Sequence, residues 1–266
     1  MSKHYEAPAE IRELEKYIND FSYKYGLERI TVFQDLLRYI INGFSLPGTP
    51  PLTDWRYNPE QGKGFYEMYC IWIKIMNRQI AIHGWYDAFG NLFMSITSQK
   101  SQQYNGQFFT PEDLCELVTA IVRPQPFKGV YDPAGGSGRF ILAARAVEPR
   151  IWGYSQDVDY LCSLMTVCNM LMNSCVGEVV CMNTITMQDF RGAWLINEFY
   201  FRTGMPSIRV MSQEEYIRFD RADMRTALLL DQKGHDDYVK FKKIWTIIKN
   251  MSYNGTEKST DEGGGA

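Results

Sequence analysis

Hydrophobic residues recur at helical spacing through the first hundred residues of the chain. In residues 9–25, three or four positions separate most of them, which is the period of an amphipathic helix; they are Ile11, Leu14, Tyr17, Ile18, Phe21 and Tyr25. The same spacing returns in residues 30–44, 65–83 and 86–98, while residues 45–55 form a proline-rich loop. We therefore expect a helical N-terminal domain over residues 1–105.

From Gly129 onward the pattern changes to short apolar runs that alternate with helical stretches. It predicts helices near 137–147 and 158–173, and strands over residues 129–132, 150–157, 178–183 and 193–201. Strands and helices in turn indicate βαβ units and a parallel sheet. The fold class is therefore α/β.

Two further strands, 207–212 and 226–232, and a helix over 236–250 are expected to complete an α/β domain over residues 106–250. The far edge of this sheet is expected to be trimmed. The glycine-rich, polar residues 251–266 are expected to be disordered.

Composition narrows the function only a little. The 266 residues carry a net charge of −3, and their 45% hydrophobic and 22% charged residues are ordinary for a globular protein. Residues 191–256 hold more basic than acidic side chains; these can face a phosphate backbone or form a solvated surface. Because no apolar run has bilayer length and the first residues do not resemble a signal peptide, we expect a cytoplasmic protein.

The six cysteines lie in apolar segments without a Cys-x-x-Cys pair, and the chain has three histidines. We read the cysteines as reduced core thiols, and we expect no zinc site.

A glycine cluster follows the first predicted strand in "YDPAGGSGRF", residues 131–140. Gly135, Gly136 and Gly138 let the backbone bend sharply and approach a ligand closely. The helix that follows directs amide groups at the same place, which favours a carboxylate or a phosphate, and Asp132 can receive an ammonium group. An amino-acid zwitterion fits this pair of poles.

The next strand ends at Asp157, about 20 residues after the glycines, where a carboxylate can accept hydrogen bonds from two ribose hydroxyls. This arrangement alone would also serve a dinucleotide, although the spacing is not Gly-x-Gly-x-x-Gly.

An aromatic stretch, "GQFFTPED", precedes the glycine cluster. Thr110 is a favourable N-cap, Pro111 suits the first helical position, and Asp113 can complete a capping box. Phe108 and Phe109, taken singly, can be ordinary core aromatics.

The stretch from Tyr86 to about Phe201 resembles the N6-adenine DNA methyltransferases, in particular the methylation subunits of type I restriction-modification systems. The matching words are "DAFGNLFMSI" (87–96), "GQFFTP" (106–111), "YDPAGGSGRF" (131–140) and "GYSQDVDYLCSLMTVCNMLMN" (153–173). The resemblance implies a Rossmann-like fold that binds S-adenosylmethionine. It implies these cofactor-binding residues: Gln107, Phe108, Phe109, Thr110, Pro111, Asp132, Pro133, Gly135, Gly136, Ser137, Gly138, Asp157, Val158, Asn183 and Thr184.

The resemblance fails at the catalytic position. The family uses Asn-Pro-Pro-Tyr or Asn-Pro-Pro-Phe to hold the target amine and to stack on a flipped base, and the sequence contains no Asn-Pro-Pro. At the expected place stands "INEFYF", in which Asn197 and Tyr200 keep the polar and aromatic side chains. Without the prolines the segment can continue as a strand, and the two side chains would then point to opposite faces.

Two hypotheses remain open. The chain is either a DNA adenine-N6 methyltransferase that uses Asn197 and Tyr200, or a degenerate relative that keeps the cofactor fold as a binding or regulatory module. The resemblance implies DNA as the substrate and a separate specificity subunit as the partner that reads it.

Overall fold

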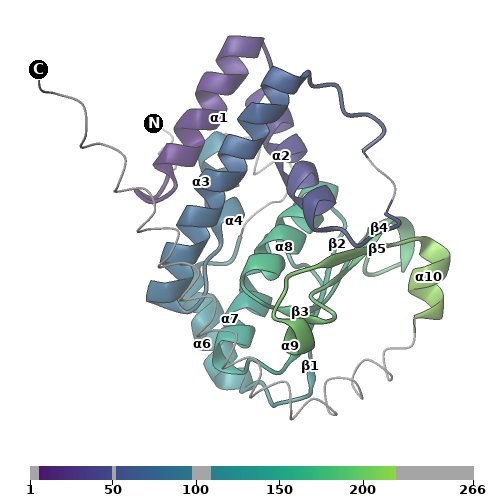
Figure 1. Ribbon diagram of the computed structural model, residues 1–266. Helices are drawn as coiled ribbons and strands as arrows, with labels where there is room; N and C mark the ends of the chain where they lie inside the picture. Colours follow the sequence, from purple (N-terminus) through teal and green to yellow (C-terminus); the bar gives the residue numbers. More distant parts are fainter. Residues whose placement is uncertain (1–5, 50–51, 98–108, 220–266) are drawn as a thin grey trace, which may run out of the picture.

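The computed structural model describes residues 6–49, 52–97 and 109–219. Four N-terminal helices pack together on one side of the sheet (Figure 1). Their bounds are α1 (Arg12–Tyr25), α2 (Arg29–Phe44), α3 (Pro59–His83) and α4 (Ala88–Ile96). The predicted helical N-terminal region is confirmed for these residues.

Helix α3 begins six residues before its predicted start. Asn58 caps it: the Asn58 side chain accepts from the Gln61 amide, and the Gln61 side chain accepts from the Asn58 amide, with Pro59 as the first helical residue. The helix therefore starts at a capping signal that lies outside the hydrophobic periodicity.

The sheet has five strands in the order β1 (Gly129–Asp132), β2 (Trp152–Asp157), β3 (Val176–Asn183), β4 (Gln188–Ile196) and β5 (Ile208–Met211). The first three strands are parallel. Helix α7 (Arg139–Val147) joins β1 to β2, and α8 (Tyr160–Met172) joins β2 to β3. This βαβαβ unit is the repeat from which Rossmann-like sheets are built, so the α/β class is confirmed.

The remaining two strands correct the expected all-parallel sheet. Strand β4 runs antiparallel to β3, with Gly177 opposite Ile196, and β5 runs antiparallel to β4. Only four residues separate Asn183 from Gln188, whereas a parallel connection needs a dozen or more. The predicted strand 193–201 is correspondingly replaced by β4 and the short helix α9 (Tyr200–Thr203).

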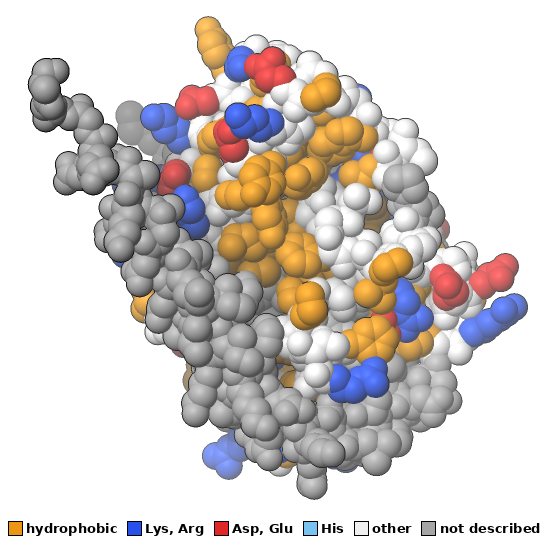
Figure 2. Space-filling model, viewed as in Figure 1, with side chains coloured by type: hydrophobic (Ala, Val, Ile, Leu, Met, Phe, Trp, Pro, Cys, Tyr) orange, Lys and Arg blue, Asp and Glu red, His pale blue; other side chains and the backbone are white. Residues whose placement is uncertain are grey.

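Two hydrophobic clusters hold the layers together. The larger one joins α1–α4 to α7 and α8, and in it the indole of Trp72 stacks on Phe89 with ring centroids 5.1 Å apart. The smaller one lies on the other face of the sheet, around Trp152, Val180 and Leu195, and includes Tyr216 of α10 (Gln213–Arg218). On the face seen in Figure 2, exposed hydrophobic side chains gather in the middle of the view, and charged side chains lie around them.

All six cysteines are free, and five of them are buried, in agreement with the prediction of core thiols. None of the helices in the described ranges is both long and apolar enough to cross a bilayer. The predicted strand 226–232, helix 236–250 and tail 251–266 lie outside the described residues.

Candidate cofactor site

The site forms at the carboxyl ends of β1 and β2, where the glycine bend closes onto the second strand. The Gly135 amide donates to the carbonyl of Gln156 at 2.9 Å, and the Gly136 amide donates to Oδ2 of Asp157 at 2.8 Å. A Cβ on Gly135 would lie 2.0 Å from Oγ of Ser155. The close approach of the bend to β2 therefore requires glycine at this position.

Asp132 and Asp157 face this edge with few partners for their charge. Oδ1 of Asp132 accepts from the Ala134 amide at 3.2 Å, and Oδ1 of Asp157 accepts from the Asp159 amide at 2.8 Å. Burial raises the pKa of both carboxyl groups, and these amide hydrogen bonds only partly oppose it. The charge of Asp157 raises the pKa of Asp132 further. A positively charged or hydroxyl-bearing ligand would relieve this excess of negative charge.

Phe109 lies against the glycine bend, so two segments that the resemblance assigns to one cofactor site are neighbours in the structure. A Cβ on Gly136, whose φ is +56°, would lie 3.0 Å from Cδ1 of Phe109. The ring of Phe109 also packs on Phe93, with centroids 5.6 Å apart. Residues far apart in the sequence are thus brought together as one wall.

The structure corrects the predicted helix start after Phe109. Helix α6 (Glu112–Val122) has Pro111 in the N-cap position, without a side-chain cap, so Thr110 does not cap the helix. Instead, the carbonyl of Thr110 accepts from Nη1 of Arg139 at 3.0 Å. Glu112 and Asp113 still place negative charge in the first turn, where it is favourable. Gln107 and Phe108 lie outside the described residues.

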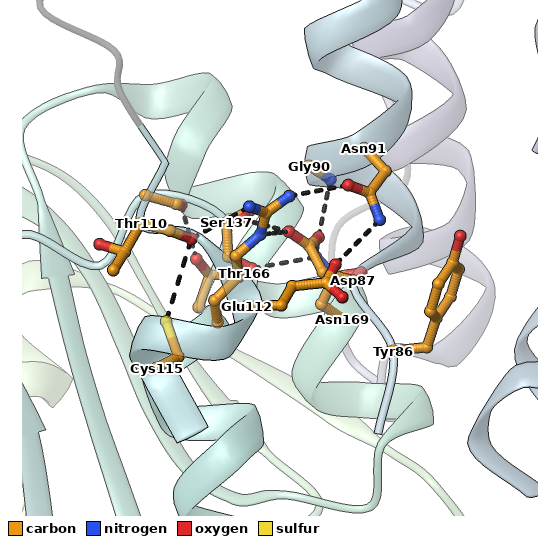
Figure 3. Close-up of polar contacts among 12 residues, drawn as sticks. Tyr86, Asp87, Gly90, Asn91, Thr110, Glu112, Cys115, Ser137, Thr166 and Asn169 are labelled. Carbon is orange, nitrogen blue, oxygen red and sulfur yellow. Dashed lines mark hydrogen bonds and ion pairs between the residues drawn. The ribbon is translucent and has the colours of Figure 1, made fainter. Parts of the chain in front are cut away.

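Beneath the site lies a buried polar network centred on Asp87, which is fully buried (Figure 3). Oδ2 of Asp87 accepts from Oγ of Ser137 at 2.6 Å and from Nε of Arg139 at 2.5 Å, while Oδ1 accepts from the Gly90 amide and from Nδ2 of Asn169. One carboxylate thus fixes the glycine bend, α4 and α8 relative to one another.

Two further side chains extend the network to neighbouring elements. Asn91 accepts from Nη2 of Arg139 at 2.9 Å and donates to Glu112 at 3.1 Å, which links α4 to α6. Asn173 bonds both the amide and the carbonyl of Tyr86. No role was predicted for Asp87, Asn91 or Asn173. The signals for them were the word "DAFGNLFMSI", and the presence of Asn169 and Asn173, one helical turn apart, in an otherwise apolar segment.

The remaining predicted cofactor residues lie around the same edge of the sheet. The Val158 side chain is 61% exposed just after β2. Oδ1 of Asn183 accepts from the amides of Ile185 and Thr186, and the Thr184 hydroxyl donates to the carbonyl of Pro133 at 2.8 Å. That last bond ties the end of β3 to the start of the glycine bend.

Asn197 and Tyr200 lie at the opposite edge of the sheet, because the antiparallel β4 ends beside the beginning of β3. Asn197 is fully buried; its Nδ2 donates to the carbonyls of Leu171 and Cys175, and its Oδ1 accepts from the Ser207 amide. The Tyr200 hydroxyl accepts from Ser174. The predicted catalytic pair is therefore corrected: the structure gives Asn197 a structural role and does not bring either residue to the site.

The parallel βαβαβ unit, with a glycine bend and carboxylates at its carboxyl edge, defines a Rossmann-like α/β fold. Residues 85–195 match the family model described as N-6 DNA Methylase. The resemblance to the N6-adenine DNA methyltransferases is thereby confirmed for this part of the chain.

Curated relatives agree with this result. The chain is 31% identical over 61 residues to the type I restriction enzyme EcoKI methylase subunit of Escherichia coli, covering 22% of this chain and 12% of that protein. It is 25% identical over 179 residues to the type I restriction enzyme MpnII methylase subunit of Mycoplasma pneumoniae, covering 62% of this chain and 31% of that protein. The chain thus spans less than a third of either relative.

Among solved structures, the type I restriction-modification methyltransferase subunit from Streptococcus thermophilus matches with 17% identity and a TM-score of 0.29. The match covers 65% of this chain and 38% of that one. In the described residues, no group of three or more histidine, cysteine, aspartate or glutamate side chains is placed to hold a metal ion.

Proposed function

We propose that the chain is an S-adenosylmethionine-binding subunit of the adenine-N6 methylation type, which acts on DNA together with a partner. The observation that carries this proposal is the contact between Phe109 and Gly136 beside Asp132 and Asp157. Relatives named as methylase subunits of restriction enzymes support a partner. We assign DNA sequence reading to a separate specificity subunit, as the resemblance to type I methylation subunits implies.

The residues at this edge fit the cofactor. In this proposal Asp132 receives the ammonium group, and the bend from Gly135 to Gly138, at the start of α7, receives the carboxylate. Asp157 accepts from the ribose hydroxyls, and the exposed Val158 packs on the adenine ring. When bound, the cofactor supplies an activated methyl group.

Calorimetric titration of S-adenosylmethionine into the full chain tests cofactor binding. Asp157→Asn keeps the side-chain shape but removes the charge, so we expect roughly tenfold weaker binding, the value of one charge-assisted hydrogen bond. Asp20→Asn, on the exposed face of α1, is the matched control and should bind like the parent. Absence of heat at millimolar ligand, or equal affinity of Asp157→Asn and parent, would refute the proposal.

A second candidate function, a cofactor-binding module that does not transfer methyl groups, is favoured by the position of Asn197. Incubation of the chain with labelled donor and mixed DNA separates the two. Labelled adenine would support methyl transfer, and the label should then survive Asn197→Ala. Bound cofactor without label in any DNA would support the module.

A further inference from the structure

Tyr131 and Gln156 form an unassigned polar pair beside the proposed cofactor site. In the sheet register Tyr131 lies opposite Tyr154, so Tyr131 and Gln156 project from the same face, because alternate residues of a strand share a face. The Tyr131 hydroxyl donates to Oε1 of Gln156. Each residue directly precedes one of the two site carboxylates, Asp132 and Asp157.

The side-chain amide of Gln156 is buried, and its donor atom makes no hydrogen bond to any described residue. The residue is only 6% exposed, and its Nε2 has no hydrogen-bond partner in the described part of the chain. A buried donor without a partner costs about 1–3 kcal/mol. Turning the amide over would pair Nε2 with the tyrosine and leave Oε1 without that bond instead, so either orientation leaves one buried polar atom of the amide unpaired among the described residues.

The side chain of Tyr131 is exposed, although its hydroxyl bonds to the buried amide. Tyr131 is 50% exposed, and β1 is an edge strand of the described sheet. Pro133 and Ala134, two and three positions further along the chain, are also exposed. A tyrosine ring at such an open edge is a platform on which a planar base can stack, and stacking suits any unpaired base.

The hydrogen-bonding pattern of the amide selects among bases. A glutamine amide matches the N6 amino group and N7 of adenine, by accepting from the first and donating to the second. The Oε1 atom can accept a second hydrogen bond besides that from Tyr131, because a carbonyl oxygen has two lone pairs.

We propose that Tyr131 and Gln156 form a subsite for an unpaired adenine base, which stacks on the tyrosine ring and pairs with the glutamine amide. This inference rests on the proposed function and gives its site a base-recognition element independent of Asn197 and Tyr200. The subsite lies at the same carboxyl edge of the sheet as the residues assigned to the cofactor, but on the face opposite to Asp132 and Asp157, because consecutive residues of a strand point to opposite faces.

Fluorescence anisotropy of the full chain with two labelled oligonucleotides tests the subsite: a strand of twelve thymidines, and the same strand with one central adenine. We expect the adenine strand to bind roughly tenfold more tightly, the value of one bidentate base contact. Gln156→Glu and Gln156→Met both remove the amide donor and should abolish the preference. Retention of the preference in both variants, or its absence in the parent, overturns the proposal.

The tyrosine is tested with a matched pair. Tyr131→Ala should weaken binding of both strands roughly tenfold through lost stacking, whereas Tyr131→Phe should keep the adenine preference. Tyr66→Ala removes a similarly exposed tyrosine on α3 and should change neither affinity. Unaltered binding in Tyr131→Ala would overturn the stacking role, and circular dichroism melting checks that each variant folds.

Titration of S-adenosylmethionine into the same variants separates this inference from the proposed function. The Gln156 variants should bind the cofactor like the parent. If they bind it tenfold more weakly and the parent shows no adenine preference, the amide serves the cofactor's own adenine and the subsite is refuted. If the parent prefers the adenine strand but does not bind the cofactor, the proposed function fails and the subsite stands.

Discussion

At the scale of single residues, Asp87 is the most connected acid of the described chain. Its two oxygens accept from Ser137, Arg139, Gly90 and Asn169, and its side chain is fully shielded from water. The charges of Asp87 and Arg139 depend on each other, because removal of one partner leaves the other as a buried, uncompensated charge. The network therefore makes the geometry of the glycine bend dependent on a residue that precedes the bend by about fifty positions.

We expect Asp87→Asn to lower the free energy of unfolding by about 3–5 kcal/mol, because the neutral amide leaves Arg139 uncompensated. Urea unfolding followed by circular dichroism measures this loss. The control is Glu6→Gln, which breaks the exposed pair with Arg12 and should cost less than about 1 kcal/mol. Similar losses in the two variants would contradict a buried role for the Asp87 charge.

For Asn197 the structure predicts a role in stability, whereas the sequence predicted a role in catalysis. Asn197→Ala should cost about 3 kcal/mol or more, because it leaves buried backbone groups, among them the Cys175 carbonyl and the Ser207 amide, without their side-chain partner. The affinity for S-adenosylmethionine should not change, since the residue lies at the other edge of the sheet. Urea unfolding and calorimetry measure the two quantities.

Asn197→Gly provides the comparison for this prediction. Asn197 has a φ of +58°, which glycine adopts without penalty but alanine does not. The glycine variant loses the same hydrogen bonds and should be less destabilised than the alanine variant. Weaker cofactor binding without a loss of stability would restore a role in the site.

At the scale of elements, the sequence predicted the existence of the strands better than it predicted their direction in the sheet. The strand Gly129–Asp132 was predicted with its observed bounds, because Pro133 and the glycines mark its end. The direction of β4 was missed because apolar runs do not encode the partner or sense of a strand. The distance from Asn183 to Gln188 does encode it, but the predicted strand began at residue 193 and hid the short connection.

Contacts in the site were predictable only between residues that belong to recognised sequence motifs. The approach of Phe109 to Gly136 follows from the quoted words, whereas the side-chain partners of Arg139 do not, because they join four segments through burial. Thr110 shows the same limit: its type favours capping, yet Pro111 takes the N-cap position and Arg139 takes the Thr110 carbonyl.

The carboxyl edge of β1 and β2 also makes stability depend on pH. Burial raises the pKa of Asp132, so the folded state holds this proton more tightly than the unfolded state does. Stability of the ligand-free chain should therefore fall as pH rises from about 3.8 through the raised pKa. Asp132→Asn removes this contribution, and its advantage over the parent in urea unfolding should grow across that window. An advantage that stays constant or shrinks with pH would contradict the raised pKa.

At the scale of the whole molecule, the N-terminal helices and the sheet share one hydrophobic core. Phe33 of α2 packs on Phe89 of α4, and the Cys168 thiol of α8 donates to the Leu37 carbonyl of α2. The predicted boundary near residue 105 therefore separates two parts of the sequence but does not interrupt this core. The helices supply one wall of the methylase-like part.

We expect the full chain to unfold in a single transition, because a shared core couples the helices to the sheet. Tryptophan fluorescence and far-ultraviolet circular dichroism in urea should give coincident midpoints. A chain that starts at residue 85 should not fold, since it would expose the surfaces of the remaining helices that are buried against α2 and α3. The single core variant Leu37→Ala should lower the free energy of unfolding by roughly 2–5 kcal/mol, the contribution of a buried leucine, and should therefore lower both midpoints together. Two separated transitions, or a folded fragment that binds S-adenosylmethionine, would instead make the helical region an independent domain.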